Sequence, residues 1–412
     1  MKILIFGAAG RMGQAIAWDL SRDKSVDEVG LIDCNDQGLC ELALNLGSSK
    51  TVTYPMDLCR KEETKKILSN YDVAVIAVPN RLLSYSLLEL GIETGIDMID
   101  ILEEYHRKPD LYETEGLKIP DGLSLREYGE ELHERAIARD ITFLDGMGFA
   151  PGLSNITVAN GITKLDHAYS VVARVGGIPN KETANRHPLK YMTTWSLEHV
   201  LREYNVKTDI LVAGKVKEVS ALSDYEVFTF EKFGKSEDFE CAVTPGMPSF
   251  IYTHPKLIEF SEKTIRWPGH YLGISTLQEC SLLDIEDRLI DGVKISPREL
   301  TLQLLNERLM PLPGDSDICV MYNTIIGEKG GDHWKIEYHM WEEADLENGF
   351  SAMARVTGFT AAVGAKFLAN NKISAKGIRA PEECIVGDIY DDYINELKLR
   401  DITIEETILR LT

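Results

Sequence analysis

Three glycines, Gly7, Gly10 and Gly13, and one aspartate, Asp33, are the first residues whose types and spacing suggest chemistry. An apolar run at residues 3–6 precedes the glycines, and a helical pattern and a second apolar run lead to the aspartate. This order of strand, glycine turn, helix, strand and acid is typical of a dinucleotide-binding unit. Gly7 permits the tight turn, and Gly10 allows a pyrophosphate to approach the backbone. Gly13 allows the helix to pack closely on the strand. The helix N-terminus favours the bound pyrophosphate.

Asp33 lies about twenty residues beyond the last glycine, where a carboxylate can hold the ribose hydroxyls. A carboxylate there repels a 2′-phosphate, so the sequence favours NAD over NADP. Arg11, inside the turn, could contact a phosphate, which leaves NADP open as the alternative. The predicted cofactor contacts are Gly7, Ala9, Gly10, Arg11, Met12, Gly13, Asp33, Asp57, Val78, Pro79, Asn80, Gly148 and Pro151.

Apolar runs and helical patterns alternate through the first 150 residues, which predicts a Rossmann domain with a doubly wound parallel sheet. After the first two strands, further strands are predicted at residues 51–54, 72–79, 97–101 and 141–144. Pro79 and Asn80 turn the chain at the end of one of these strands, at the edge where a cofactor lies in such sheets. Residues 108–123, rich in Pro, Gly and charge, are interpreted as a surface loop, with a lid as the alternative.

The pattern changes after residue 169 to short strands with glycines, including a long antiparallel hairpin at 317–326 and 333–341. An Ala- and Gly-rich helix at 351–370 is expected to return to the first domain. We therefore predict a Rossmann domain at 1–150, an inserted α+β domain at 151–348, and a C-terminal helix and tail at 349–412.

Bulk composition excludes several classes of protein. The net charge of −22 argues against a nucleic-acid or anionic-membrane partner. Seven scattered cysteines without a CxxC pattern are typical of free thiols in a reducing cytoplasm. No run approaches the ~20 apolar residues of a membrane span, and the N-terminal apolar run is too short for a signal peptide. No metal site is predicted, because no His, Cys or acid cluster has ligand spacing.

Several segments, in their order along the chain, resemble the saccharopine dehydrogenase (reductase) and lysine 6-dehydrogenase family of NAD(P)-dependent oxidoreductases. They are DGMGFAPG (145–152), VGGIP (175–179), PLKYMTTWS (188–196), KTIRWPGH (263–270), AMAR (352–355) and APEE (380–383). The resemblance implies that the inserted domain binds substrate and forms a homodimer through its sheet. It also implies chemistry at a C–N bond of an amino acid with a side-chain amine or imine. The glycine turn is also similar to that of dihydrodipicolinate reductases, but the chain lacks their paired histidines.

Substrate contacts are expected within these segments. Arg266 is the first candidate, because a guanidinium offers two parallel donors to a substrate carboxylate. Arg174 is the second, although its place on a predicted strand favours a structural ion pair. Tyr191, Trp195 and Ser196 come from the segment that resembles a substrate-facing one, and Trp195 is equally compatible with a core position.

The reaction also needs a group that moves a proton. His270, Lys190, His187 and His199 are candidates, among which His270 leads because of its neighbours in the sequence. Asp100, at the end of the fifth predicted strand, is a further candidate, with a cap of the sheet end as the alternative.

Together these features predict a cytoplasmic NAD(P)-dependent oxidoreductase that acts on the CH–NH or CH–NH2 group of an amino acid, with NAD preferred. A carboxynorspermidine- or homospermidine-type polyamine dehydrogenase is one alternative. A non-catalytic NAD-binding sensor is the other.

Overall fold

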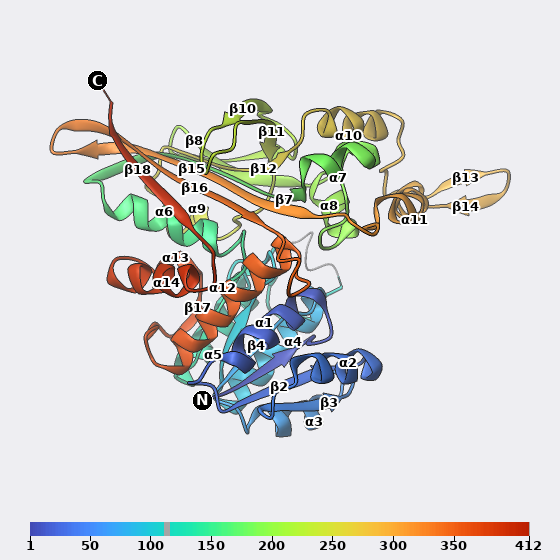
Figure 1. Ribbon diagram of the computed structural model, residues 1–412, viewed down its shortest axis with the longest axis vertical. Coiled ribbons are helices and arrows are strands. Elements are labelled where there is room, and N and C mark those ends of the chain that lie inside the picture. Colours follow the sequence, from blue (N-terminus) through green and yellow to red (C-terminus); the bar gives the residue numbers. More distant parts are fainter. Residues whose placement is uncertain (111–115, 412) are drawn as a thin grey trace. The chain divides into compact units, whose positions relative to one another are not determined.

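The computed structural model describes residues 1–110 and 116–411, which form two compact units (Figure 1). Unit 1 comprises Met1–Lys164, Met247–Pro255 and Ala354–Thr403, and unit 2 comprises Leu165–Gly246, Lys256–Met353 and the chain from Ile404 onward. The loop predicted at residues 108–123 lies partly outside the described residues. None of the described helices is both long enough and apolar enough to cross a lipid bilayer.

Unit 1 is built on a parallel sheet of seven strands in the order β17-β6-β5-β4-β1-β2-β3. The strands are β1 (Lys2–Phe6), β2 (Glu28–Asp33), β3 (Thr51–Pro55), β4 (Val73–Ile76), β5 (Asp97–Asp100), β6 (Thr142–Leu144) and β17 (Gly377–Arg379). The order of the first six strands is that of a doubly wound dinucleotide-binding sheet. The predicted Rossmann architecture is therefore confirmed.

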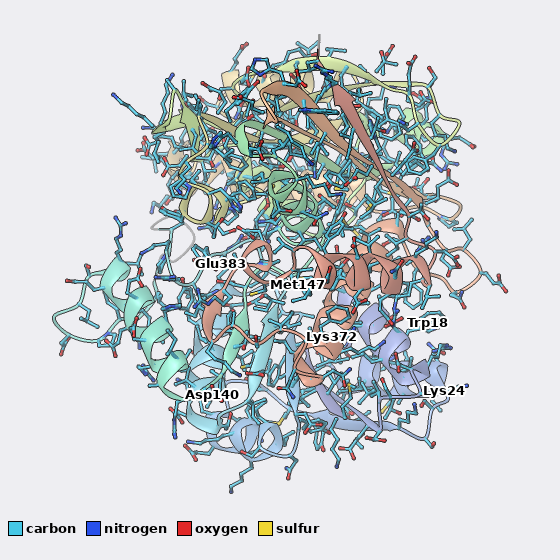
Figure 2. All side chains as sticks on the ribbon, turned by 90° about the vertical axis from the view of Figure 1, so that its left-hand side faces the viewer. Trp18, Lys24, Asp140, Met147, Lys372 and Glu383 are labelled. Carbon is cyan, nitrogen blue, oxygen red and sulfur yellow. The ribbon has the colours of Figure 1, made fainter. Side chains whose placement is uncertain are left out.

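The helices of unit 1 occupy the connections between these strands and the C-terminal part of the chain. They are α1 (Arg11–Arg22), α2 (Asp36–Leu46), α3 (Lys61–Leu68), α4 (Arg81–Thr94), α5 (Leu125–Ala138), α6 (Leu153–Thr163), α9 (Phe250–Thr253), α12 (Ala352–Ala369), α13 (Pro381–Cys384) and α14 (Asp388–Lys398). Trp18 of α1, labelled in Figure 2, stacks on Phe359 of α12 with ring centroids 5.7 Å apart. Gly358 lies against α1, since a Cβ there would come within 2.7 Å of the Ala15 side chain. Most of helix α12 thus belongs to unit 1, where it packs against α1.

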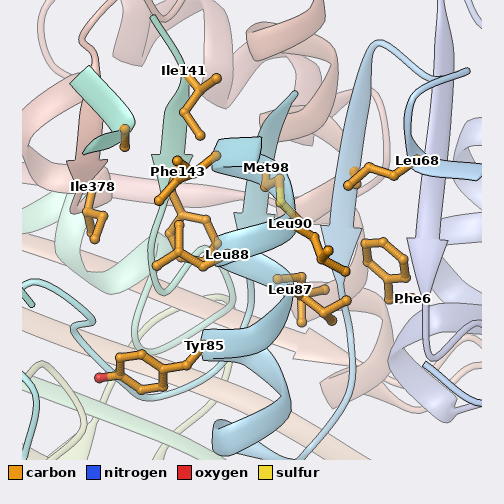
Figure 3. Packing of buried hydrophobic residues seen from close by; sticks show 14 of the residues in the cluster. Phe6, Leu68, Tyr85, Leu87, Leu88, Leu90, Met98, Ile141, Phe143 and Ile378 are labelled. Atoms are coloured by element: carbon orange, nitrogen blue, oxygen red, sulfur yellow. The ribbon is translucent and has the colours of Figure 1, made fainter. Parts of the chain in front are cut away.

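The core of unit 1 forms where α4 and the strands pack together. Phe6, Leu88, Met98 and Phe143 are fully buried there and belong to one hydrophobic cluster (Figure 3). The strands alternate little between apolar and polar residues, as expected for a sheet covered on both faces. This core holds the carboxyl ends of β1, β2, β4 and β5 at one edge.

Two features of this sheet differ from the sequence-based expectation. Strand β4 (Val73–Ile76) is shorter than the predicted 72–79, because the chain leaves the sheet before Pro79, which cannot donate to a ladder. Strand β17 was not predicted, because three residues are too few to show a period.

Unit 2 contains a mixed sheet of nine strands, in the order β10-β11-β12-β7-β15-β16-β18, with β8 paired to β12 and β9. The strands are β7 (His167–Pro179), β8 (Lys207–Val212), β9 (Lys215–Ser220), β10 (Glu226–Phe230), β11 (Glu237–Val243), β12 (Glu259–Arg266), β15 (Asp317–Lys329), β16 (Asp332–Glu343) and β18 (Ile404–Arg410). The predicted hairpin is confirmed as β15 and β16, which a turn at Gly330 and Gly331 connects. Strand β18, which lies in the predicted C-terminal segment, pairs with β16.

Short helices and a separate hairpin complete unit 2. They are α7 (Lys181–Arg186), the 3-10 helix η1 (Pro188–Lys190), α8 (Leu197–Glu203), α10 (His270–Glu279), α11 (Pro297–Leu309), β13 (Arg288–Ile290) and β14 (Val293–Ile295). Tyr191, Leu201, Tyr204, Ala242 and Ile274 form one buried cluster. These contacts show that η1, α8 and α10 cover the face of β11 that carries Ala242.

Replacement of Gly13 by alanine is expected to destabilise unit 1. The new Cβ would lie 2.2 Å from the carbonyl oxygen of Gly7, and neither backbone can move freely. We expect Gly13→Ala to lower the free energy of unfolding by about 3 kcal/mol, measured by chemical denaturation. Gly95→Ala is the control, because nothing lies within 4 Å of its Cβ and only its φ of +75° costs about 1 kcal/mol. Equal losses in the two variants would contradict the close packing of α1 on β1.

Candidate active site

The glycine turn joins β1 to α1 and presents a helix N-terminus. Gly7 has a left-handed φ of +80°, and a Cβ there would lie 2.7 Å from the carbonyl oxygen of Ala77. Gly10 is the N-cap of α1, and no described side chain caps this helix. Among the described residues, a Cβ on Gly10 would meet only the Gly7 carbonyl, at 3.3 Å. The turn therefore leaves room for an anionic group to reach the first turn of the helix.

Asp33, the last residue of β2, lies beside this turn. Its Oδ2 accepts a hydrogen bond from the Ala9 amide at 3.0 Å, and its Oδ1 accepts one from the Asn35 amide at 2.9 Å. Each carboxylate oxygen can accept a second hydrogen bond, so Asp33 can bind ribose hydroxyls while it keeps its bonds to the two amides. The turn and Asp33 together fit a dinucleotide cofactor.

The other predicted cofactor contacts in unit 1 follow β3 and β4. Val78 is buried next to the turn, and its Cγ1 is 2.9 Å from where a Gly7 Cβ would lie. Pro79 follows, and Asn80 caps α4 by accepting a hydrogen bond from the Leu83 amide. Asp57 follows β3. Its carboxylate is exposed to solvent and accepts a hydrogen bond from the Cys59 amide at 2.9 Å.

The segment after β6 lies at the end of β5. The Met147 amide, whose residue is labelled in Figure 2, donates to the Asp100 carbonyl at 2.7 Å. Gly148 and Pro151 are both buried, and the Gly148 amide donates to the Pro151 carbonyl at 2.9 Å. The structure thus brings Gly148 and Pro151 to the sheet edge at which the sequence placed them.

Asp100 belongs to a buried chain of hydrogen bonds. Ser84 of α4 donates to Asp100 Oδ2, and its hydroxyl is 2.9 Å from His106 Nε2. His106 Nδ1 lies 2.9 Å from Asp145 Oδ1, and the His106 amide donates to Asp145 Oδ2 at 2.6 Å. Asp100 also accepts from the Leu102 amide at 2.7 Å, so it caps the strand end as well. Acid, hydroxyl, imidazole and acid are therefore linked in series.

The charges in this chain are strongly coupled. Burial raises the pKa of Asp100 to about 6, against the opposing effect of His106 and Ser84. Burial likewise raises the pKa of Glu104, which accepts from Tyr85, to about 7. Burial disfavours the charged form of His106, but the carboxylates of Asp145, Asp100 and Glu104 raise its pKa to about 9. At neutral pH, His106 is therefore a buried imidazolium surrounded by three acidic residues.

Sequence reasoning missed Ser84, His106 and Asp145 as members of this chain, and it missed Glu104 as a nearby acid that raises the pKa of His106. His106 and Asp145 are 39 residues apart, and only the parallel pairing of β5 and β6 makes them neighbours. The one available signal was the placement of His106 and Asp145 just beyond two predicted strand ends, on the same side of the sheet as Asp100.

In unit 2, Arg266 lies at the end of β12 and is 4% exposed. Its Nε donates to the Tyr204 hydroxyl at 2.8 Å, and its Nη1 donates to the Ile265 carbonyl at 2.9 Å. The guanidinium carbon lies 5.2 Å from the ring centroid of Tyr191. Its Nη2 makes no hydrogen bond within the described part of the chain. Arg266 is thus held rigidly and keeps one donor group for a ligand.

His270 contacts Tyr204, the residue that accepts a hydrogen bond from Arg266. Its Nδ1 is 2.8 Å from the Leu189 carbonyl, and its Nε2 is 3.0 Å from the Tyr204 hydroxyl. Burial and the nearby Arg266 lower the pKa of His270 to about 3, so the ring is neutral. The neutral ring therefore donates from Nδ1 and accepts from Tyr204, whose oxygen accepts in turn from Arg266. This geometry orients Arg266, and a proton-transfer role for His270 stays a prediction.

The other predicted residues of unit 2 are spread around this group. Lys190 donates to Asn185 Oδ1 at 2.8 Å and lines a pocket of about 340 Å³ with Trp267. Tyr191 is buried beneath Arg266. Trp195 is half-buried and stacks on His199, and Ser196 caps α8.

Two further candidates from the sequence are bound to carboxylates. His187 is buried with its Nε2 2.6 Å from Asp315 Oδ2. Arg174 pairs with Glu226, as its strand position favoured.

Charged His106 is expected to make the stability of unit 1 depend on pH. Its pKa is raised from 6.5 to about 9 on folding, so its contribution is complete below pH 6.5 and is lost as the pH rises through about 9. Between about pH 7 and about pH 9.5, the wild type should lose more free energy of unfolding than His106→Gln, measured by urea denaturation. His133→Gln is the control, since burial lowers the pKa of His133 and it stays neutral over this range. Parallel curves for wild type and His106→Gln would exclude an imidazolium.

Comparisons with known proteins agree with this architecture. Residues 3–144 match the saccharopine dehydrogenase NADP binding domain, and residues 148–402 match the saccharopine dehydrogenase C-terminal domain. The solved structure of apo saccharopine dehydrogenase (L-Glu forming) from Saccharomyces cerevisiae superimposes with a TM-score of 0.79, covering 99% of both chains at 18% identity, which shows a shared fold.

The curated relatives are about a fifth identical to this chain over the residues that align. Alpha-aminoadipic semialdehyde synthase of Arabidopsis thaliana is 22% identical over 62% of this chain, which spans only 31% of that protein. Carboxyaminopropylagmatine dehydrogenase of Synechocystis is 22% identical, covering 93% of this chain and 92% of the relative. Saccharopine dehydrogenase [NADP(+), L-glutamate-forming] of Saccharomyces cerevisiae is 22% identical over 65% of this chain and 74% of its own length. With most of its length matched by these two domain models, the chain belongs to the saccharopine dehydrogenase family.

Proposed function

We propose that the protein is an NAD(P)-dependent oxidoreductase that transfers hydride at the CH–NH or CH–NH2 group of an amino acid. The observation that carries this proposal is Arg266, a buried guanidinium with Nη2 kept for a ligand, in a chain that also holds a dinucleotide-binding turn. Both the yeast and the Synechocystis relatives are dehydrogenases by name, which supports the reaction class.

The chain's own residues divide the work of such a reaction. The first turn of α1 binds the pyrophosphate, and Asp33 binds a ribose. A bound nicotinamide supplies the hydride chemistry. Arg266 holds the substrate carboxylate, with Tyr204 and His270 fixing the guanidinium.

We assign to Asp100 the proton transfer that the reaction at the C–N bond needs. It lies at the carboxyl end of β5, and its raised pKa suits an acid that works near neutral pH. Ser84 and His106 position it. The pKa of His270 is lowered to about 3, so this ring takes up no proton near neutral pH and fits the role less well. Lys190, whose amino group donates to Asn185, stays a second candidate.

Two alternatives remain distinguishable by experiment. The Synechocystis relative, which matches nearly the whole of both chains, favours a polyamine-type dehydrogenase as the second candidate. For a non-catalytic NAD sensor, NADH binding would persist without any substrate-dependent change in its absorbance. Homodimer formation through the sheet of unit 2 and a cytoplasmic location stay predictions.

The direct test is reduction of NAD and NADP by the purified protein. The substrate panel contains saccharopine, lysine, carboxynorspermidine and common amino acids, and reduction is followed by absorbance. Turnover of one panel member supports the proposal. Intact NADH binding with no turnover of any member would favour the sensor.

Substitution of Arg266 tests the carboxylate site. Arg266→Lys keeps the charge but loses the planar fork and the bond to Tyr204, so we expect KM for the amino acid to rise at least about tenfold while kcat changes less. Arg174→Lys, on the same sheet but paired with Glu226, should leave KM nearly unchanged. An unaltered KM in Arg266→Lys would remove this residue from the substrate site.

Substitution of Asp33 tests the choice of cofactor. Its carboxylate favours NAD by repelling a 2′-phosphate, whereas the matching domain model and the yeast relative both carry NADP in their names. We expect Asp33→Ser to shift the ratio of kcat/KM toward NADP by at least about tenfold, or about 1.4 kcal/mol. Asp36→Ser, a neighbouring exposed acid, is the control for net charge. A ratio that does not move in Asp33→Ser would show that Asp33 does not select the cofactor.

A further inference from the structure

Unit 2 contains a pocket apart from the group around Arg266. It has a volume of about 340 Å³, at the lower end of the range for sites that hold small molecules. Residues of α7, η1, β10 and β11 and of the segment that follows β12 line it, and all of them belong to unit 2. Arg266, Tyr204 and His270 are not among its described lining residues, so the pocket is a second cavity rather than part of the first site.

The apolar part of the lining is rigid. It consists of Trp267, Pro268 and Ala184. The Trp267 indole is 6% exposed, and its Nε1 donates to the Pro179 carbonyl at 2.7 Å. Its ring centroid lies 4.7 Å from that of Phe239. Because these contacts fix the indole, the pocket offers a ligand a preformed apolar surface.

Lys190 of η1 brings a positive charge to the pocket. Its ammonium group donates to Asn185 Oδ1 at 2.8 Å and makes no ion pair with any residue that the structure describes. An ammonium group has three donors, so two of them remain for a ligand. The side-chain nitrogen of Asn185 also keeps its donors, since no described residue accepts from it. Lys190 and Asn185 together are donors of the kind that bind a carboxylate.

The backbone at Lys190 is strained and firmly held. Leu189 and Lys190 have φ values of 57° and 50°, in the left-handed region that is costly for residues with a Cβ. The Leu189 carbonyl accepts from His270 Nδ1 at 2.8 Å. The Leu189 side chain lies against Gly273, where a Cβ would come within 2.5 Å of Leu189 Cδ2. Backbone strain of this kind gathers at ligand-binding and active sites, where one side chain must keep its position.

The two acids of the lining differ in their partners. Glu237 pairs with Lys181 at 2.6 Å, so these two charges balance each other. Asp238 of β11 is exposed to solvent and, within the described part of the chain, is bonded only to the Thr229 hydroxyl, at 2.7 Å. The lining therefore includes one cation, Lys190, and one anion, Asp238, that are each bonded to a neutral group alone.

We propose that this pocket binds a free amino acid with an apolar side chain, as a zwitterion, at a site separate from the substrate site at Arg266. Lys190 and Asn185 bind its carboxylate, and Asp238 binds its ammonium group. Trp267 packs against its apolar side chain. A ligand with only one of the two charges would leave Lys190 or Asp238 without an opposite charge. The site goes beyond the proposed function and does not rest on it, and it gives Lys190 a role other than proton transfer.

The test measures binding of L-leucine to the full chain by titration calorimetry. Two further probes each carry one of its charges, since 4-methylpentanoate lacks the amino group and 3-methylbutylamine lacks the carboxylate. The pocket variants are Lys190→Met and Asp238→Asn, which each remove one charge and keep the length of the side chain. Lys215→Met is the matched control, because Lys215 is an exposed lysine of β9 in the same unit. Thermal unfolding verifies that the variants fold.

We expect the wild type and Lys215→Met to bind L-leucine at least about tenfold more tightly than either pocket variant does, because each pocket variant loses a hydrogen bond to a charged group. For the same reason, the wild type should bind each single-charge probe at least about tenfold more weakly than L-leucine. Equal binding of the three probes, no binding at millimolar concentration, or an L-leucine affinity that Lys190→Met or Asp238→Asn leaves unchanged would overturn the assignment.

Arg266→Lys separates the pocket from the substrate site. We expect this variant to keep the L-leucine affinity of the wild type, because Arg266 is not among the described lining residues. An affinity that falls in Arg266→Lys and not in the pocket variants would place the amino acid at Arg266 and overturn the assignment. Because the readout is binding and not turnover, failure of this site and failure of the proposed function are distinguishable.

Discussion

The contact between Gly13 and the carbonyl of Gly7 is the constraint on which unit 1 depends. Because neither residue has a side chain at this point, α1 packs directly on the turn that leaves β1. This packing places the helix N-terminus and the carboxyl end of β2 together, and Asp33 secures the turn through the Ala9 amide. The parallel register of β1, β2, β4 and β5 then brings Val78 and Asp100 to the same edge. A binding site for a dinucleotide follows from backbone geometry.

The two units stabilise a buried cation in different ways. In unit 1, His106 is surrounded by Asp145, Asp100 and Glu104, so a cation inside the protein is balanced by acids. In unit 2, Arg266 is stabilised by the hydroxyl of Tyr204 and by the aromatic rings around it. Neutral His270 accepts the proton of that hydroxyl in a hydrogen bond, which leaves the hydroxyl oxygen to accept from Arg266. Such networks hold a few side chains in one orientation, which is what a site for a small polar substrate needs.

The chain through Asp100, Ser84, His106 and Asp145 is linked by hydrogen bonds from one end to the other. Asp100 also accepts from the Leu102 amide, so both of its carboxylate oxygens have a partner. Burial raises the pKa of Asp100 to about 6, so its protonation state changes close to neutral pH.

Some of this protein can be derived from the sequence alone. The glycine turn, the strand ends that carry Asp33 and Asp100, and the β15–β16 hairpin were predictable because each signal is local. Arg266 was singled out because it stands in a recognisable segment, and its role as a substrate ligand stays a prediction.

Only the tertiary structure decided which distant residues meet. His106 joins Asp145, and His270 joins Leu189 and Tyr204, through sheet pairing and helix packing that no local pattern encodes. It also placed β17 beside β6 and made His270 a neutral support, because burial and neighbouring charge, which set a side chain's protonation, exist only in the folded chain.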